Sequence, residues 1–175
     1  VPTGSGKTFA AVMGPIAAVL AETEDHPGIR LLDITPLRAL SRDLALAIRE
    51  PITEMRWPLR VGIRNGDSSS SERSKQLKSP PQILVTTPES LTLLLSNSKA
   101  EELFRHLDTV VLDEWHELMG SKRGTQTELC LSWLRQQRPS LQTWAISATI
   151  GNLAQAARHA LGTDGDPVII GGAPA

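Results

Sequence analysis

The chain has 175 residues, of which 40% are hydrophobic and 21% charged, and its formal net charge is −1. These values predict one globular domain with an adequate core, and they exclude a strong basic field over the whole chain. Any nucleic-acid binding must therefore be local. No apolar run reaches membrane-spanning length, so we expect no membrane partner. The single cysteine, Cys130, cannot form an internal disulfide, which is consistent with a cytoplasmic location and a packing role.

The first feature in chain order is a predicted phosphate-binding loop. It comprises Thr3, Gly4, Ser5, Gly6, Lys7 and Thr8. Small residues and glycines let successive backbone N–H groups point at one anion. Lys7 would reach the outer phosphates of ATP in a catalytic role, and Thr8 would offer its hydroxyl to Mg²⁺ at the start of a helix. Taken alone, this short pattern leaves a chance resemblance open.

Apolar extended runs then alternate with amphipathic stretches, which is typical of βαβ units and a parallel sheet. Strands are expected at 29–35, 59–63, 82–86, 109–112, 141–146 and 168–170. Helices are expected at 7–21, 36–50, 69–78, 88–97, 98–106, 125–137 and 152–161. The pattern predicts an α/β domain with a mainly parallel sheet and helices on both faces.

Prolines and capping residues predict several helix boundaries. Pro15 is expected to kink or break the first helix, and Pro51 is expected to end the second, because proline lacks an N–H group. Ser69 and Glu72 have the spacing of a capping box. Residues 120–124 are expected to form an exposed basic turn.

The same pair of residues begins two of the predicted helices. Thr35-Pro36 and Thr87-Pro88 each follow a strand and place a hydroxyl at the N-cap and proline at the first helical position. Such helix starts lie at the carboxyl edge of a parallel sheet, and their free N–H groups can bind phosphate. They are candidates for binding a sugar–phosphate backbone. The alternative is that Thr-Pro is simply favourable chemistry for starting a helix, and the pair alone favours that alternative.

Two adjacent carboxylates follow the strand at 109–112. Asp113 fits the role of holding Mg²⁺, and Glu114 fits the activation of water. An Asp-Glu pair at the end of a strand is a weak signal by itself, because surface carboxylates are common there. Together with the phosphate-binding loop, however, the pair predicts an ATP site.

Five segments, taken together, resemble the motifs of superfamily 2 helicases in the same order. Motifs I, Ia, Ib, II and III correspond to residues 2–8, 35–40, 86–91, 113–116 and 147–149. The sequence DEWHEL at 113–118, followed by GSKRG at 120–124, is most similar to the large helicase-related (Lhr) group. Within that group it is most similar to the bacterial DExH-box helicase associated with a DNA ligase. The resemblance covers nearly the whole chain.

This resemblance implies the first RecA-like domain of an ATP-dependent motor that moves along single-stranded nucleic acid, usually 3′ to 5′. DNA is favoured over RNA, and the family suggests a role in DNA repair with ligase or nuclease partners. Residues 1–162 would form the domain, and 163–175 a short strand and the start of a linker. The N-terminal segment, the first strand and the second RecA-like domain would be missing. Turnover by this domain alone is expected to be slow, because an arginine finger contributes about 10³- to 10⁵-fold in kcat.

The resemblance also implies roles for residues outside the ATP site. Coupling of nucleotide state to domain closure would involve His116, Ser147 and Thr149. The nucleic-acid track would comprise Thr35, Arg38, Arg64, Gly66, Asp67 and Thr87. A solvated surface role is the alternative for Arg38 and Arg64.

Two other functions stay open at this point. The domain could act as an ATP-gated clamp or remodeller that binds strands without processive unwinding. It could also belong to a different P-loop enzyme, such as a small-molecule kinase. The kinase is disfavoured because no acceptor-substrate lid is recognisable and residues 147–149 would be unexplained.

Overall fold

The structure is a computed structural model, which describes residues 6–22, 26–147, 153–162 and 167–170. Its helices are α1 (Lys7–Ala21), α2 (Arg38–Glu54), α3 (Ser70–Lys78), α4 (Pro88–Leu95), α5 (Ala100–Phe104), α6 (Trp115–Leu118), α7 (Lys122–Gln137) and α8 (Leu153–Leu161). Its strands are β1 (Leu31–Ile34), β2 (Val61–Arg64), β3 (Ile83–Thr86), β4 (Thr109–Leu112) and β5 (Gln142–Ala145). Within the described residues, no helix is both long enough and apolar enough to cross a membrane.

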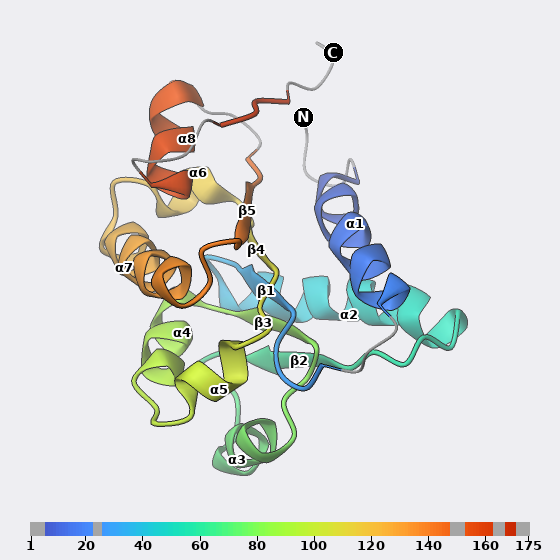
Figure 1. Cartoon of the computed structure of the whole chain (residues 1–175). Helices are drawn as coiled ribbons and strands as arrows, with labels where there is room; N and C mark the ends of the chain where they lie inside the picture. The colour runs from blue at the N-terminus through green and yellow to red at the C-terminus, as the bar shows by residue number, and fades with distance from the viewer. Residues whose placement is uncertain (1–5, 23–25, 148–152, 163–166, 171–175) are drawn as a thin grey trace.

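The five strands form one parallel sheet in the order β2-β3-β1-β4-β5 (Figure 1). Leu31 of β1 lies opposite Ile83 of β3 and Thr109 of β4, so the three central strands begin at the same level. The predicted α/β class with a parallel sheet is confirmed. Because the strands are parallel, all of their carboxyl ends lie at one edge.

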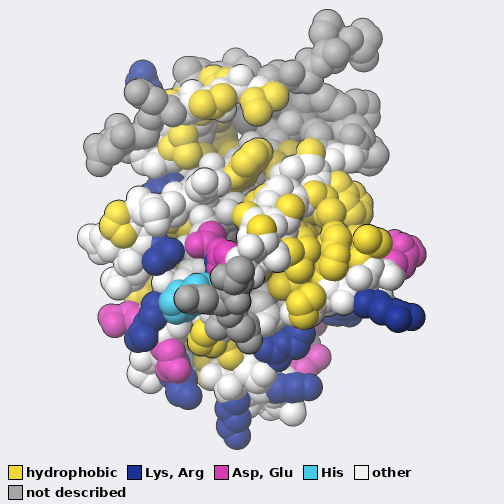
Figure 2. All heavy atoms as spheres, turned by 45° about the vertical axis from the view of Figure 1, so that its right-hand side comes forward, with side chains coloured by type: hydrophobic (Ala, Val, Ile, Leu, Met, Phe, Trp, Pro, Cys, Tyr) yellow, Lys and Arg dark blue, Asp and Glu magenta, His cyan; other side chains and the backbone are white. Residues whose placement is uncertain are grey.

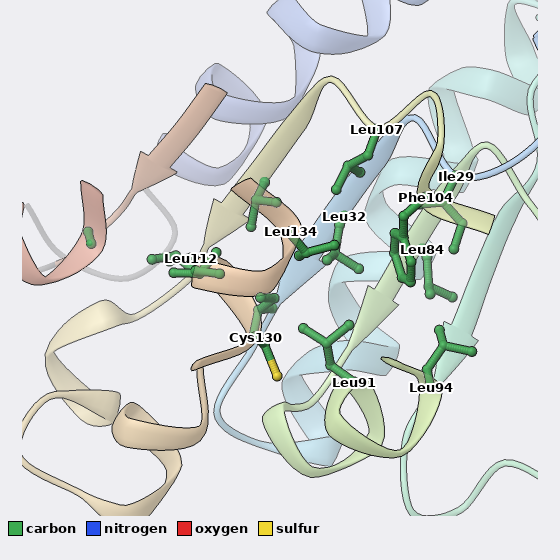
Figure 3. Packing of buried hydrophobic residues seen from close by; sticks show 14 of the residues in the cluster. Ile29, Leu32, Leu84, Leu91, Leu94, Phe104, Leu107, Leu112, Cys130 and Leu134 are labelled. Atoms are coloured by element: carbon green, nitrogen blue, oxygen red, sulfur yellow. The ribbon is translucent and has the colours of Figure 1, made fainter. Parts of the chain in front are cut away.

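The central strands are buried on both faces, and successive side chains enter different cores. On one face, Leu31, Val85 and Val111 pack against α1 and α2. On the other face, Leu32 and its neighbours pack against α4, α5, α7 and α8 (Figure 3). Cys130 lies in this second core, which confirms its predicted packing role. The expectation of helices on both faces is therefore also confirmed.

The outer surface of α1 and α2 carries exposed hydrophobic side chains. Figure 2 shows hydrophobic side chains gathered on the side of the molecule that these helices form. Phe9, Leu46 and Met55 are among the large hydrophobic side chains exposed there.

Both internal prolines lie inside continuous helices, so the predicted end of α2 at Pro51 is wrong, and of the kink or break predicted at Pro15 the break is wrong. α1 continues through Pro15, and α2 continues through Pro51 to Glu54. Each proline removes one helical hydrogen bond, but tertiary packing compensates. In the last turn of α2, Ile52 is buried in the core beside Ile48, which favours continuing the helix past Pro51.

Helix starts agree with the prediction only in part. The capping box is confirmed, since Ser69 Oγ accepts a bond from the Glu72 N–H and the Glu72 carboxylate accepts one from the Ser69 N–H. α2, however, begins at Arg38 with Leu37 as its N-cap, so the predicted start at Thr35-Pro36 is wrong. At Thr87-Pro88 the N-cap position is confirmed, although the Thr87 hydroxyl makes no capping bond.

Residues 120–124 do not form the predicted turn throughout, because α7 already begins at Lys122. Ser121 caps that helix by accepting a hydrogen bond from the Gly124 N–H at 3.1 Å. The strand predicted within 168–170 is also wrong. Residues 167–170 have no regular secondary structure, and Val168 is exposed and pairs with no strand among the described residues.

Candidate nucleotide and nucleic-acid site

The loops that carry the predicted site residues meet at the carboxyl edge of the sheet. The N–H of Thr35, after β1, donates to Thr86 O of β3 at 2.9 Å. The N–H of Asp113, after β4, donates to Ile34 O of β1 at 3.0 Å, and Trp115 N donates to Ile146 O, after β5, at 2.9 Å. Parallel pairing therefore brings segments that are far apart in sequence into contact at one edge.

At the start of α1 the structure describes only the last part of the predicted phosphate-binding loop. Gly6 is the N-cap of α1 in the left-handed conformation, with φ of 77°, and its carbonyl accepts the Ala10 N–H at 2.9 Å. This conformation favours glycine, and it leaves the first N–H groups of α1 without helical partners. Thr3, Gly4 and Ser5 lie outside the described residues, as do the side chains of Lys7 and Thr8. Their roles stay predictions.

The two carboxylates after β4 occupy a buried and strained turn. Asp113 is buried, and its Oδ1 accepts the Glu114 N–H at 3.1 Å. Glu114 has φ of 46°, a left-handed conformation that is costly for a residue with a Cβ. Its Oε2 is buried and has no hydrogen-bond partner among the described residues, although His116 Nδ1 lies 3.3 Å away without hydrogen-bond geometry. A buried carboxylate oxygen of this kind fits a site that receives a water molecule or a cation.

His116 connects this turn with the end of β5. Its Nδ1 lies 2.8 Å from Ser147 Oγ, so the predicted coupling residues His116 and Ser147 are in contact. Thr149 lies outside the described residues. Helix α6, which carries His116, is anchored by Trp115, whose buried indole N–H donates to Ala156 O of α8 at 3.0 Å.

Asp33 is a buried carboxyl group that was not among the predicted site residues. It lies in the middle of β1, fully buried, and neither carboxylate oxygen has a hydrogen-bond partner among the described residues. Burial raises its pKa well above the ordinary value, and the charge of the neighbouring Asp113 adds to the rise. A carboxyl group inside the apolar run Leu31–Ile34 was the signal that could have identified it.

The turn after β2 is a polar cluster built around Asn65. The buried Asn65 Nδ2 donates to Ser41 Oγ of α2 at 2.8 Å, and its Oδ1 accepts the Asp67 N–H at 2.9 Å. The Asp67 carboxylate then bridges Arg38 at 3.1 Å and Arg42 at 2.7 Å. The i, i+4 spacing of these two arginines places both on one face of α2, which could have revealed Arg42.

Arg38 and Gly66 form the exposed surface of that turn. A Cβ at Gly66 would lie 2.7 Å from Arg38 Nε, so glycine is required for the guanidinium to lie against the backbone. Arg38 is exposed but paired with Asp67, so its charge is already partly neutralised. Gly66, Asp67 and Arg38 therefore lie together on one surface, as the predicted nucleic-acid track requires.

Arg64 differs from Arg38, because only 8% of it is exposed. Its Nη1 lies 3.4 Å from both Arg73 O and Gln76 Oε1 of α3. Burial, together with the charge of Arg73, lowers the pKa of the Arg64 guanidinium. The alternative of a solvated surface role is wrong for Arg64, and its side chain stabilises the junction of β2 with α3.

Thr35 and Thr87 are also buried, and their hydroxyls bond within the protein. Thr35 Oγ1 donates to Leu37 O at 3.0 Å, and Thr87 Oγ1 donates to Ser90 Oγ at 3.3 Å. These hydroxyls therefore shape the two loops. A nucleic-acid strand at this edge would meet the loop backbones and the first turns of α2 and α4.

The parallel sheet and the turns at its carboxyl edge define the class of RecA-like domains. The chain belongs to the DEAD/DEAH box helicase family, whose family model matches residues 1–156. It is 38% identical to the ATP-dependent helicase Lhr-Core of Sulfolobus acidocaldarius, a match that covers 97% of this chain and 20% of that protein. It is 39% identical to the Lhr helicase/uracil glycosylase of Escherichia coli, covering 99% of this chain and 12% of that protein.

A solved structure supports the same assignment. The helicase Lhr of Mycobacterium smegmatis, bound to ssDNA and AMP-PNP, is 35% identical with a TM-score of 0.80. That match covers 90% of this chain and 21% of that one. The chain thus spans about a fifth or less of the length of these proteins. The resemblance to the RecA-like domains of the Lhr group is confirmed, and the alternative of a small-molecule kinase is wrong.

Proposed function

We propose that this chain is the ATP-binding motor domain of an ATP-dependent helicase that couples ATP hydrolysis to movement along single-stranded nucleic acid. The observation that carries the proposal is the contact of His116 with Ser147 beside the buried oxygen of Glu114. This contact links the turn that would activate water to a second strand end. Through this contact, a change in the bound nucleotide can be transmitted to the other loops at the carboxyl edge of the sheet.

In this proposal the ATP site is built from α1 and the turn after β4. Lys7 and the N–H groups of residues 4–8 hold the phosphates at the positive end of α1. Mg²⁺, held by Thr8 and Asp113, would neutralise charge on the phosphates. Glu114 orients the attacking water and accepts its proton, and its buried Oε2, which has no hydrogen-bond partner among the described residues, is suited to that role.

The strand would lie across the loops that follow β1, β2 and β3. Arg38, Gly66 and Asp67 supply one side of this track, and the loops shaped by Thr35 and Thr87 supply the other. The single-stranded DNA in the Mycobacterium smegmatis structure supports DNA as the strand. The 3′-to-5′ direction, the role in DNA repair, the ligase or nuclease partners, the second RecA-like domain and the cytoplasmic location are proposed from the resemblance alone.

The test is ATP turnover by the natural full-length protein, with and without single-stranded DNA or RNA. We expect strong stimulation by DNA, weaker stimulation by RNA, and none of either in Lys7→Ala, which should no longer bind ATP. Unchanged ATP affinity in Lys7→Ala would overturn the ATP site.

A strand-displacement assay then separates the motor from the clamp. Stimulated turnover with displacement supports the helicase. Stimulated turnover without displacement identifies the clamp or remodeller instead, and turnover that no strand stimulates rejects both.

A further inference from the structure

Arg123 joins the two loops that we propose to bind the strand. It lies in the first turn of α7, which packs beside α4 (Figure 1). Its Nε donates to Glu89 Oε1 at 2.5 Å, and its Nη1 donates to Pro36 O at 3.1 Å. Glu89 belongs to the first turn of α4, and Pro36 belongs to the loop after β1. One guanidinium thus connects three segments that are distant in sequence.

The backbone that carries Arg123 is held firmly against the turn of the ATP site. Ser121 Oγ donates to Leu118 O of α6 at 2.6 Å and accepts the Gly124 N–H. A Cβ at Gly124 would lie 2.9 Å from the carbonyl carbon of Leu118, so α6 and α7 touch backbone to backbone. α6 directly follows Asp113 and Glu114. Arg123 therefore connects the two loops, through α7 and α6, to the turn that carries the ATP-site carboxylates.

The charge of Arg123 is already balanced within the protein. Burial acts to raise the pKa of Glu89, but its own backbone N–H group and Arg123 outweigh burial, and the pKa lies below the ordinary value. Glu89 is thus ionised at neutral pH and forms a charge-assisted pair with the guanidinium. A guanidinium whose Nε and Nη1 are both bonded within the protein is better suited to fixing geometry than to attracting a phosphate.

We propose that Arg123 is a positioning residue for strand binding, which holds the loop 35–37 and the start of α4 at the spacing that a sugar–phosphate backbone requires. The proposal rests on the function proposed above. In this proposal Arg123 acts on the strand indirectly, through Pro36 and Glu89. A direct phosphate contact by Arg123 is the competing explanation.

Two substitutions test these explanations, and the sign of the effect of Glu89→Gln distinguishes them. In Arg123→Ala, we expect the strand concentration for half-maximal stimulation of ATP turnover to rise about tenfold, with turnover at saturating strand kept within about twofold, as for loss of one charged hydrogen bond. In Glu89→Gln, positioning predicts weaker strand binding, because the charge that holds Arg123 is removed. Direct phosphate contact predicts tighter binding instead, because Arg123 is released and a repulsive charge is lost.

Lys122→Ala is the matched control, because it removes one positive charge from the adjacent exposed position of α7. We expect little change in this variant. The salt dependence of strand binding gives a second readout. Losing a phosphate contact lowers the slope of log K against log salt by about 0.7, whereas loss of positioning leaves it unchanged.

The outcomes separate the two proposals. If the unaltered protein shows no strand-stimulated turnover, the proposed function fails. If stimulation is present but Arg123→Ala behaves like Lys122→Ala, or Glu89→Gln binds the strand more tightly, only the role of Arg123 is overturned.

Discussion

Replacing Gly124 with alanine should separate the start of α7 from α6. The new Cβ would lie 2.9 Å from the carbonyl carbon of Leu118 and closer still to its oxygen. Ordinary carbon contacts lie at about 3.5–4.0 Å, so the carbon contact alone requires the two backbones to part by roughly 0.6–1.1 Å, and the nearer oxygen requires more. Neither partner is a flexible side chain that could turn aside.

The cost can be worked from three contributions. Overpacking against fixed atoms costs about 1–3 kcal/mol, and losing the Ser121 cap costs about 1 kcal/mol. Alanine in place of glycine returns up to about 1 kcal/mol of helix propensity. The net destabilisation of α7 is therefore about 1–3 kcal/mol, which corresponds to roughly 5- to 150-fold faster hydrogen exchange through local opening.

Hydrogen exchange of the α7 amides, followed by mass spectrometry in the natural full-length protein, measures this change. Gly120→Ala is the matched control, because nothing lies within 4 Å of a Cβ at that position. Its cost is confined to a left-handed backbone with φ of 68°, about 1–2 kcal/mol at the turn itself. Protection of α7 in Gly124→Ala that equals the unaltered protein, or exceeds that of Gly120→Ala, would refute the reasoning.

Three further predictions concern the ATP site. Glu114→Gln should keep ATP binding but lower kcat about 10²- to 10⁴-fold, and near-normal turnover would place the base elsewhere. In a double-mutant cycle on strand-stimulated turnover, His116→Ala and Ser147→Ala should be non-additive because the side chains are bonded, whereas additive effects would contradict coupling. Asp33→Val should stabilise the fold by about 1–3 kcal/mol in thermal or denaturant unfolding, because it removes two buried oxygens that have no hydrogen-bond partner in the part of the chain that the structure describes. The folded-state pKa of Asp33 is raised, so its effect on stability depends on pH. The protein is most stable with respect to Asp33 below the unfolded pKa of about 3.9, and that stability is lost as pH rises through the folded-state pKa. This loss of stability with rising pH should be absent in Asp33→Val. A pH profile of stability equal to that of the unaltered protein would contradict the prediction.

Several parts of the fold could be predicted from sequence because they depend on neighbours along the chain. Apolar runs bounded by turn residues gave the strands from β1 to β5 to within a few residues. The capping box of Ser69 with Glu72 was predictable, because both partners lie within one turn of helix. The Asp113-Glu114 pair could be recognised because its position at the end of β4 is a local property.

Other predictions failed where tertiary contacts outweighed local preference. Pro51 should end a helix by its own chemistry, but packing of Ile52 in the core keeps α2 continuous. Trp144 lies in an apolar run that favours burial, yet 40% of it is exposed because β5 is at the edge of the sheet. Arg64 has the composition of a surface turn, but the fold of α3 over β2 buries it.

By itself, the sequence determined the class of domain and the residue types at each strand end, because periodicity and short motifs act locally. Only the tertiary structure decided which strand ends are neighbours. The order β2-β3-β1-β4-β5 places the loop after β1, which belongs to the proposed strand track, between the loop after β3 and the ATP-site turn after β4. It also brings Arg123 to Pro36 and Glu89. Strand order and such long-range pairs arise from non-local burial and hydrogen bonding, which no local pattern in the chain records.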